Sequence, residues 1–144
     1  MSLKLTIQNK LINYIMQDGK KQTAEKLLLK SYKLIQKIQK KKKFKDIFKL
    51  ALVNSSPFFY IKQIQRKKKK VLEFPFLLKN SLKLHYGIKS IIYQTNLKTS
   101  FSFYKKCSFE IINSSKCTSE GVKKKKETYK TAFLTKRYAN YRWF

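Results

Sequence analysis

The chain has 144 residues, of which 35 are lysine or arginine and only 7 are aspartate or glutamate, so its formal net charge is +28. Its hydrophobic fraction of 42% is too high for a disordered basic tail, so we expect a folded core covered by lysines. A compact domain with this charge repels itself unless a polyanion neutralises it, and nucleic acid is the commonest such partner.

Three amphipathic helices are predicted in the first part of the chain, over residues 3–17, 21–40 and from 44 to about 53. Gly19 suits a left-handed position after the first helix, and the segment from Asn54 to Pro57 ends the third. The apolar spacing predicts that the inward-facing residues are Ile7, Leu11, Ile12, Ile15, Met16, Ala24, Leu27, Leu28, Ser31, Leu34, Ile35, Ile38, Phe44, Ile47, Phe48, Ala51 and Leu52.

The period changes to an alternation between about residues 58 and 78. Aromatic and β-branched residues alternate with polar ones up to Gln65, and a second alternating run follows the charged loop, which indicates a β-hairpin. Pro75 cannot donate to a strand ladder, so its strand should lie at an edge. Because a two-stranded hairpin is marginal alone in water, an arm with a polycationic tip suggests an anionic receptor.

Three further helices complete the prediction. Asn80 and Ser81 are expected to cap a fourth helix, which buries a stripe that includes Ile88 and Ile91. A fifth helix is expected over about residues 99–112, and a last one begins with the lysines at 123–126, after a polar loop. The predicted fold is mainly α, a bundle of about six helices with one protruding β-hairpin, in a single domain over residues 1–144.

The sequence offers no catalytic, metal or cofactor site. His85 is the only histidine, and it has no obvious carboxylate or nucleophile partner. Cys107 and Cys117 lie ten positions apart without further zinc ligands, so we expect two half-buried apolar residues and no disulfide. The acidic residues are scattered singly, which argues against a two-metal site. We therefore expect a protein that is not an enzyme.

The signal for binding lies in three runs of four lysines at the edges of predicted elements. One such run is usually a solvated surface, but three of them with a large net charge indicate contact with a polyanion. A helix N-terminus would add its free N–H groups to the last run. The runs are Lys40, Lys41, Lys42 and Lys43; Lys67, Lys68, Lys69 and Lys70; and Lys123, Lys124, Lys125 and Lys126.

The chain ends in an aromatic and basic segment. Tyr138 is expected in the core, whereas two roles stay open for Arg142 and Trp143: stacking on unpaired bases or packing of the last helix. No stretch approaches the roughly 18 apolar residues of a membrane span. The N-terminal residues enter helical periodicity directly, so we expect the chain to work in the compartment in which it is made.

Several segments are similar in order and spacing to those of a known family. They are LINYIMQDGKK at residues 11–21 with AEK at 24–26, ALVNSSP at 51–57, Phe74-Pro75, GVKKKKE at 121–127 and ANYRW at 139–143. Together they resemble small ribosomal subunit protein seven over essentially the whole chain. The abundance of Lys, Ile, Asn, Phe and Tyr is typical of an AT-rich gene, which indicates an organellar member, mitochondrial rather than plastid.

The resemblance implies a six-helix bundle with a protruding hairpin that binds the 3′ major domain of small-subunit ribosomal RNA. It also implies a role in assembling the subunit head, beside other head proteins and near the exit site for tRNA and mRNA. By position, it implies RNA contacts at Lys20, Lys21, Lys62, Arg66, Lys67, Lys68, Lys69, Lys70, Lys123, Lys124, Lys125, Lys126, Arg137 and Arg142.

The chain departs from the family pattern in three places. Almost no basic arm precedes the first helix, and the hairpin loop has lysines where the family has a glycine pair, which predicts a wider turn. Residues 80–98 match poorly, so the RNA contacts of the fourth helix are open. Two other functions compete with this interpretation: a cationic amphipathic protein of membrane surfaces and another basic protein acting on nucleic acid.

Overall fold

The structure is a computed structural model that describes residues 2–40, 42–65, 71–99 and 101–140, with side chains from residue 7 onward. Its elements in chain order are α1 (Ser2–Ile15), α2 (Lys21–Ile38), α3 (Phe44–Ser55), β1 (Phe59–Ile64), β2 (Leu72–Leu77), α4 (Asn80–Leu97), α5 (Phe103–Ser115), α6 (Glu120–Leu134) and the short 3-10 helix η1 (Lys136–Tyr138). Within the described ranges, the predicted six helices and one hairpin are therefore confirmed.

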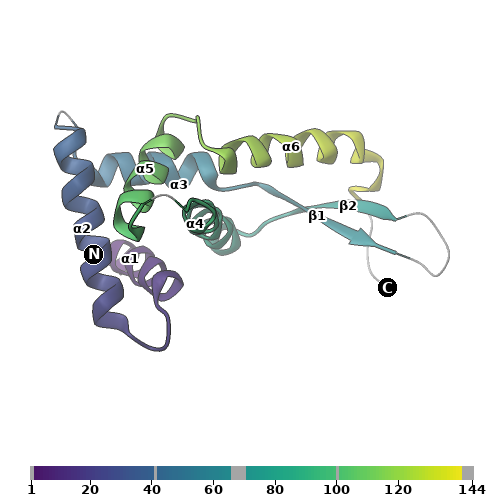
Figure 1. Ribbon diagram of the computed structural model, residues 1–144. Coiled ribbons are helices and arrows are strands. Elements are labelled where there is room, and N and C mark those ends of the chain that lie inside the picture. The colour runs from purple at the N-terminus through teal and green to yellow at the C-terminus, as the bar shows by residue number, and fades with distance from the viewer. Residues whose placement is uncertain (1, 41, 66–70, 100, 141–144) are drawn as a thin grey trace.

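The molecule is elongated, with a helical body at one end and the hairpin at the other (Figure 1). Helices α1 to α5 form the body, and α6 extends from it alongside the hairpin. The α2–α3 connection lies at the end of the body that is farthest from the hairpin. This shape separates basic segments that a spherical fold would bring closer together.

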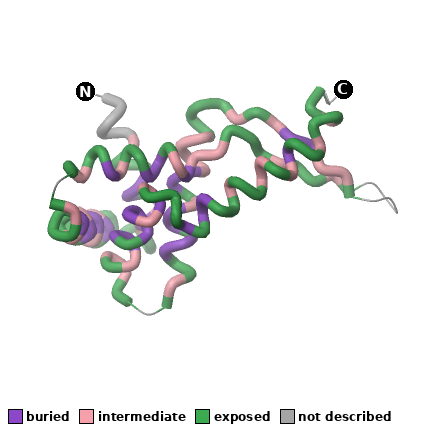
Figure 2. The backbone as a smooth tube through the Cα atoms, turned by 90° about the horizontal axis from the view of Figure 1, so that it is seen from above, coloured by how far each residue is buried: buried purple, intermediate pink, exposed green. Residues whose placement is uncertain are grey.

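Helix α5 lies at the centre of the body, where it contacts α2, α3 and α4. Figure 2 shows the buried backbone concentrated in this region, whereas the outer turns of the helices are exposed. The amphipathic spacing places one apolar stripe of each helix inward. The core consists of Leu11, Ile12, Ile15, Ala24, Leu28, Ile35, Ile47, Ala51, Leu52, Ile88, Ile91, Ile92, Cys107, Ile111 and Ile112.

Most of the predicted inward-facing residues of the first three helices are buried or half-buried, as expected from their spacing. Ile38 is an exception, since half of its surface is exposed in the last turn of α2. The last turn extends past the part of the bundle that would cover it. Periodicity identifies the face of a helix but not how far along it the neighbouring helices reach.

The connection between α1 and α2 is a tight turn with two left-handed residues. Asp18 has φ 50° and Gly19 has φ 70°, and the Lys20 N–H donates to the Gln17 carbonyl at 3.0 Å. Asp and Gly are the residues that tolerate this conformation best. The left-handed glycine is thus confirmed, although α1 ends at Ile15, two residues earlier than predicted.

The hairpin is antiparallel, with Phe59 opposite Leu77 and Ile64 opposite Leu72. Pro75 lies opposite Ile61, and β2 has no second strand partner among the described residues, which agrees with the expected edge position. Tyr129 on α6 holds the base of the hairpin, and its ring lies 5.8 Å from that of Phe59. The Phe58 N–H donates to the Tyr129 hydroxyl at 2.9 Å.

Three predicted boundaries in the C-terminal half are wrong. Asn80 and Ser81 lie inside α4, and its N-cap position is Lys79 without a side-chain cap. Helix α5 starts at Phe103 and not near residue 99. Helix α6 starts at Glu120, because the Ser119 side chain accepts a hydrogen bond from the Gly121 N–H and caps it three residues earlier than the lysine run suggested.

Candidate nucleic-acid interface

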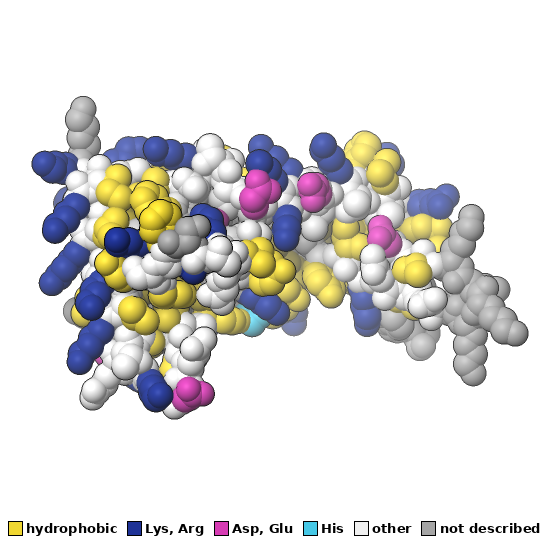
Figure 3. Space-filling view, in the orientation of Figure 1, with side chains coloured by type: hydrophobic (Ala, Val, Ile, Leu, Met, Phe, Trp, Pro, Cys, Tyr) yellow, Lys and Arg dark blue, Asp and Glu magenta, His cyan; other side chains and the backbone are white. Residues whose placement is uncertain are grey.

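Basic side chains cover much of the described surface. Figure 3 shows lysine and arginine around the periphery of one face, over α2 and along α6, with few acidic side chains between them. Lys20 and Lys21 lie at the start of α2, and their ammonium groups are 3.9 Å from Asp18 and 4.0 Å from Glu25. These contacts are long and exposed, so they compete weakly with phosphate groups.

The first lysine run forms the connection between α2 and α3. Lys40, Lys42 and Lys43 are exposed, and Lys41 lies outside the described residues. Gln36 holds this connection from both sides: its amide donates to the Lys42 carbonyl at 3.4 Å, and its side-chain oxygen accepts from the Phe44 N–H at 3.2 Å. These two hydrogen bonds connect the backbone at Lys42 and Phe44 to α2.

The hairpin places Lys62 on β1, opposite Phe74 on β2, with its side chain exposed. Beside this pair, the Gln63 amide donates to the Glu73 carboxylate at 3.0 Å. Glu73 thus has a partner on the hairpin itself. The predicted contacts at Arg66, Lys67, Lys68, Lys69 and Lys70 lie outside the described residues.

The four lysines of α6 differ in what they contact, although the sequence makes them look equivalent. The Lys125 ammonium donates to the Val53 carbonyl at 3.2 Å and to the Asn54 carbonyl at 3.0 Å, which are two carbonyls in the last turn of α3. A cation at a helix C-terminus also interacts favourably with the helix dipole. Partial burial lowers the pKa of Lys125. Its structural contact removes Lys125 from the group of lysines that face solvent.

The neighbours of Lys125 remain at the surface. Lys123 pairs with Glu120 at 2.6 Å, and this hydrogen bond raises the pKa of the Lys123 ammonium. The Lys124 ammonium lies 5.2 Å from the centre of the Tyr93 ring on α4. Lys126 is exposed. Because α6 begins at Glu120, its free N–H groups precede the lysines, so the prediction that the lysine run itself forms the helix N-terminus is wrong, and phosphate binding by these lysines stays a prediction.

A buried carboxylate fixes the start of α6. Glu110 on α5 is 2% exposed, and it accepts a hydrogen bond from the hydroxyl of Ser119, the N-cap of α6. The Lys98 ammonium lies 2.6 Å from the other carboxylate oxygen. This arrangement ties α4, α5 and α6 together through one side chain, so the orientation of the α6 lysines depends on Glu110.

The end of α6 returns to the hairpin. Tyr138 in η1 was expected in the core, but it is only half-buried, and its ring lies 5.4 Å from that of Phe74 on the hairpin. The Arg137 guanidinium lies 4.7 Å from the centre of the Tyr138 ring, so Arg137 is held at the surface beside the hairpin. Arg142 and Trp143 lie outside the described residues.

An aromatic series that sequence reasoning missed connects the body to the hairpin. The Tyr14 hydroxyl lies 3.0 Å from His85 Nε2, the His85 ring contacts Tyr86 at 5.5 Å, and Tyr86 stacks on Tyr60 at 5.6 Å. His85 is therefore a boundary residue with a partner on α1, and no carboxylate is among its described contacts. Tyr14 and His85 are 71 positions apart, so no local pattern could have indicated the contact.

The described residues offer no candidate metal site. No three His, Cys, Asp or Glu side chains of the described ranges gather closely enough to hold an ion. Both cysteines are free; Cys107 is fully buried and Cys117 is exposed, so the prediction that both are half-buried is wrong. In the part of the chain that the structure describes, no helix has the length and apolarity needed to cross a bilayer.

Comparison with known proteins identifies the family. The family model described as ribosomal protein S7p/S5e matches residues 2–136. The small ribosomal subunit protein uS7 of Mycoplasma mobile is 31% identical over 138 residues, which cover 93% of this chain and 85% of that protein. The uS7c protein of Euglena gracilis is 32% identical over 94% of this chain, and uS7 of Nitratiruptor is 29% identical over 95% of it. The chain belongs to the ribosomal protein S7p/S5e family and is a structural protein rather than an enzyme.

Proposed function

We propose that this chain is a constituent of the small ribosomal subunit that binds the 3′ major domain of the subunit's RNA. The observation that carries the proposal is the family match over residues 2–136. The surface agrees with it, because lysines dominate the exposed charge and one of the seven acids, Glu110, is buried in an internal contact. Loose phosphate contacts by many lysines supply affinity without base-specific readout.

The mechanism is the fixing of RNA segments by a preformed wedge. The body is organised around α5, and aromatic contacts hold the base of the hairpin, so lysines on separate elements keep fixed mutual distances. RNA that contacts two of these elements must adopt a matching arrangement. We propose that this constraint helps to assemble the head of the subunit, beside other head proteins and near the exit site for tRNA and mRNA.

The RNA contacts in this proposal form two groups. Among the described residues they are Lys20, Lys21, Lys40, Lys42, Lys43, Lys62, Lys123, Lys124, Lys126 and Arg137, whereas Lys125 is left out because of its contact with α3. On the sequence alone they include Lys41, Arg66, Lys67, Lys68, Lys69, Lys70, Arg142 and Trp143.

We also propose that the ribosome in question is mitochondrial, with a plastid ribosome as the alternative. The support is compositional: 32 of the 35 basic residues are lysine and only 3 are arginine, as expected from an AT-rich gene. Fractionation of source cells, followed by detection of the chain in purified mitochondria or plastids, decides between the two.

The test of the main proposal compares transcripts of the 5′ and 3′ major domains of small-subunit RNA at equal length and salt. We expect preferential binding of the 3′ major domain, and co-sedimentation of the native chain with small-subunit particles. Equal affinity for both transcripts would reject the proposed RNA domain. A chain that sediments away from these particles in its own cells would reject the ribosomal role.

A further inference from the structure

A groove of about 470 Å³ lies where the end of α2, the start of α3 and the end of α5 meet. The α2–α3 connection, which carries Lys40 and Lys42 of the groove, lies at the end of the molecule farthest from the hairpin (Figure 1). Four lysines line the groove: Lys37, Lys40, Lys42 and Lys116. None of the described residues that line it is acidic, so their positive charge is not neutralised by another residue of this lining.

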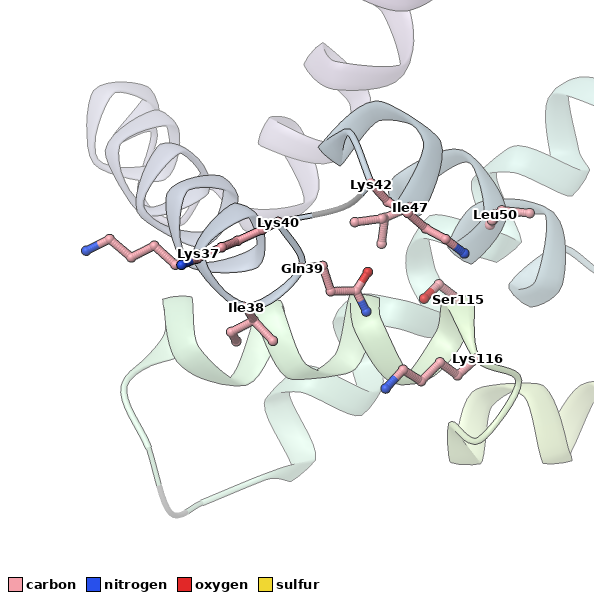
Figure 4. Close-up of a pocket in the computed structure, with 9 residues that line it drawn as sticks. All are labelled: Lys37, Ile38, Gln39, Lys40, Lys42, Ile47, Leu50, Ser115 and Lys116. Atoms are coloured by element: carbon pink, nitrogen blue, oxygen red, sulfur yellow. The ribbon is translucent and has the colours of Figure 1, made fainter.

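The groove also has an apolar component. Ile38 and Leu50 line it and are 50% and 46% exposed, respectively. In Figure 4, Gln39, Lys42 and Lys116 extend between the helices, whereas Lys37 and Lys40 run along the outer side of α2. A pure anion would need only the ammonium groups. Apolar surface beside them suits a ligand that carries a phosphate together with a ribose or a base.

Hydrogen bonds within the protein connect the described backbone segments around the groove. Gln36 bridges the connection that carries Lys42, as described above. The Lys116 N–H donates to the Ile112 carbonyl at 3.1 Å at the end of α5. Asn54 on α3 donates its amide to the Ser114 and Ser115 carbonyls at 3.0 and 3.1 Å, which joins two of the three walls. A site built on fixed backbone loses less conformational entropy on binding.

We propose that this groove binds an unpaired nucleotide of an RNA segment distinct from the one that meets the hairpin. Lys42 and Lys116 contact its phosphate, Lys37 and Lys40 contact flanking phosphates, and Ile38 and Leu50 lie against the ribose or base. The inference rests on the proposed binding of ribosomal RNA. The volume lies within the range of about 300–1,000 Å³ that is usual for small-ligand sites. The chain would then connect two RNA segments at its opposite ends.

The direct test is photocrosslinking of the full chain to a single-stranded oligouridylate of about ten nucleotides that contains 4-thiouridine. We expect crosslinked peptides that contain residues 36–50 and 111–118, in addition to any from the hairpin. A blunt RNA duplex of equal length should crosslink there much less, because its bases are not available to the apolar residues. Crosslinks that avoid both peptides, or equal crosslinking of the duplex, would overturn the proposal.

Matched variants distinguish the contribution of the groove to RNA affinity from the effect of removing any two positive charges. Lys42→Gln with Lys116→Gln removes two charges from the groove, and Lys26→Gln with Lys30→Gln removes two exposed charges from α2 outside it. We expect the groove variant to bind the oligouridylate about tenfold more weakly, with the salt slope reduced by about 1.4 for two lost phosphate contacts. The control should lose less than about threefold. Equal losses in both variants would contradict the groove site.

A third variant, Leu50→Ser, tests the apolar contact without changing charge. We expect it to reduce crosslinking to residues 36–50 while the salt slope stays unchanged. The preference for the 3′ major domain is measured separately. If that preference is absent but the groove crosslinks, the proposed function fails and the groove site stands; if the preference is present without groove crosslinks, only the groove site fails. Protection of the groove by a neighbouring protein in place of RNA in the native particle would also overturn it.

Discussion

Lys98 at the end of α4 forms an ion pair of 2.6 Å with Glu110, a carboxylate that α5 buries among helices. The same carboxylate accepts a hydrogen bond from Ser119, which caps α6. The chain has 35 basic residues and seven acidic ones, and one of these seven is thus buried in a contact within the protein. Its role is to hold three helices together rather than to neutralise the surface.

Replacing Glu110 with alanine should lower the free energy of unfolding by about 2–3 kcal/mol, because the Ser119 hydroxyl loses its acceptor and Lys98 loses its partner. Glu110→Gln should cost about 1 kcal/mol, since it keeps the shape and one acceptor. Urea denaturation followed by circular dichroism measures both. Glu127→Gln, at an exposed position of α6, is the control and should change stability by less than about 0.5 kcal/mol. Equal effects at 110 and 127 would contradict the network.

Lys125 and Lys126 should have opposite effects although they are neighbours. Lys125→Gln removes the donor to the last turn of α3 and should cost about 1 kcal/mol of stability, with little change in RNA affinity. Lys126→Gln should leave stability unchanged and reduce the salt slope of RNA binding by roughly 0.7–0.9. Denaturation and fluorescence anisotropy at several salt concentrations test the pair. Identical behaviour of the two variants would refute the assignment.

Gly87 on α4 packs directly on Ser56, where α3 ends. A Cβ at position 87 would lie 2.5 Å from Ser56 Oγ and 3.3 Å from Ser56 Cα. Gly87→Ala should therefore destabilise the protein by about 1–3 kcal/mol. Adding Ser56→Ala should recover part of this loss, because the closest atom is then gone. A double-mutant cycle by thermal unfolding measures the coupling, and strictly additive effects would count against the close approach.

The two cysteines should differ in reactivity. Burial raises the pKa of Cys107 to about 12, from an ordinary value of 9.0. Between these values an unfolded thiol releases its proton and the folded one keeps it, so stability should fall as pH rises above about 9. In the native state iodoacetamide should alkylate Cys117, which is exposed, and leave Cys107 unmodified. Mass spectrometry of peptides after brief labelling tests this; rapid labelling of Cys107 in folded protein would contradict its buried position.

The large net charge predicts a strong dependence of folding on ionic strength. Uncompensated repulsion in a protein of charge +28 should lower the melting temperature at low salt, and added salt or RNA should raise it. Differential scanning calorimetry with and without a ribosomal RNA transcript measures the shift. A melting temperature that stays constant across salt concentrations and RNA would show that the repulsion is already compensated within the chain.

The helical body could be predicted from the sequence because its signal is local. Leu28 and Ile35 repeat at helical spacing, and both are fully buried. Helix ends were less predictable, since a cap depends on which hydroxyl reaches a free N–H. Ser119 caps α6 by accepting from Gly121, whereas Asn80 and Ser81 look equally suitable at α4 and do not cap it.

For the binding surface, the sequence predicted the type of residue, lysine, but not which individual lysines are free to contact RNA. The described lysines of the runs at 40–43 and 123–126 are exposed as expected, except for Lys125, which is half-buried and has two carbonyl partners 71 and 72 positions away. The groove beside Lys42 was also invisible in the sequence, because Lys116 reaches it from another helix. Local patterns report charge and period, while the contacts that distinguish identical neighbours arise from the packing of distant segments.

The central position of α5 has a consequence for synthesis. Because α5 is the fifth helix in chain order and fills the space between α2, α3 and α4, those three cannot close a common core until residue 115 has left the ribosome that makes the chain. Their apolar faces stay open during most of elongation, on a nascent chain that already carries most of its lysines. Compaction of this polypeptide is therefore a late event in translation, set by the topology of one helix.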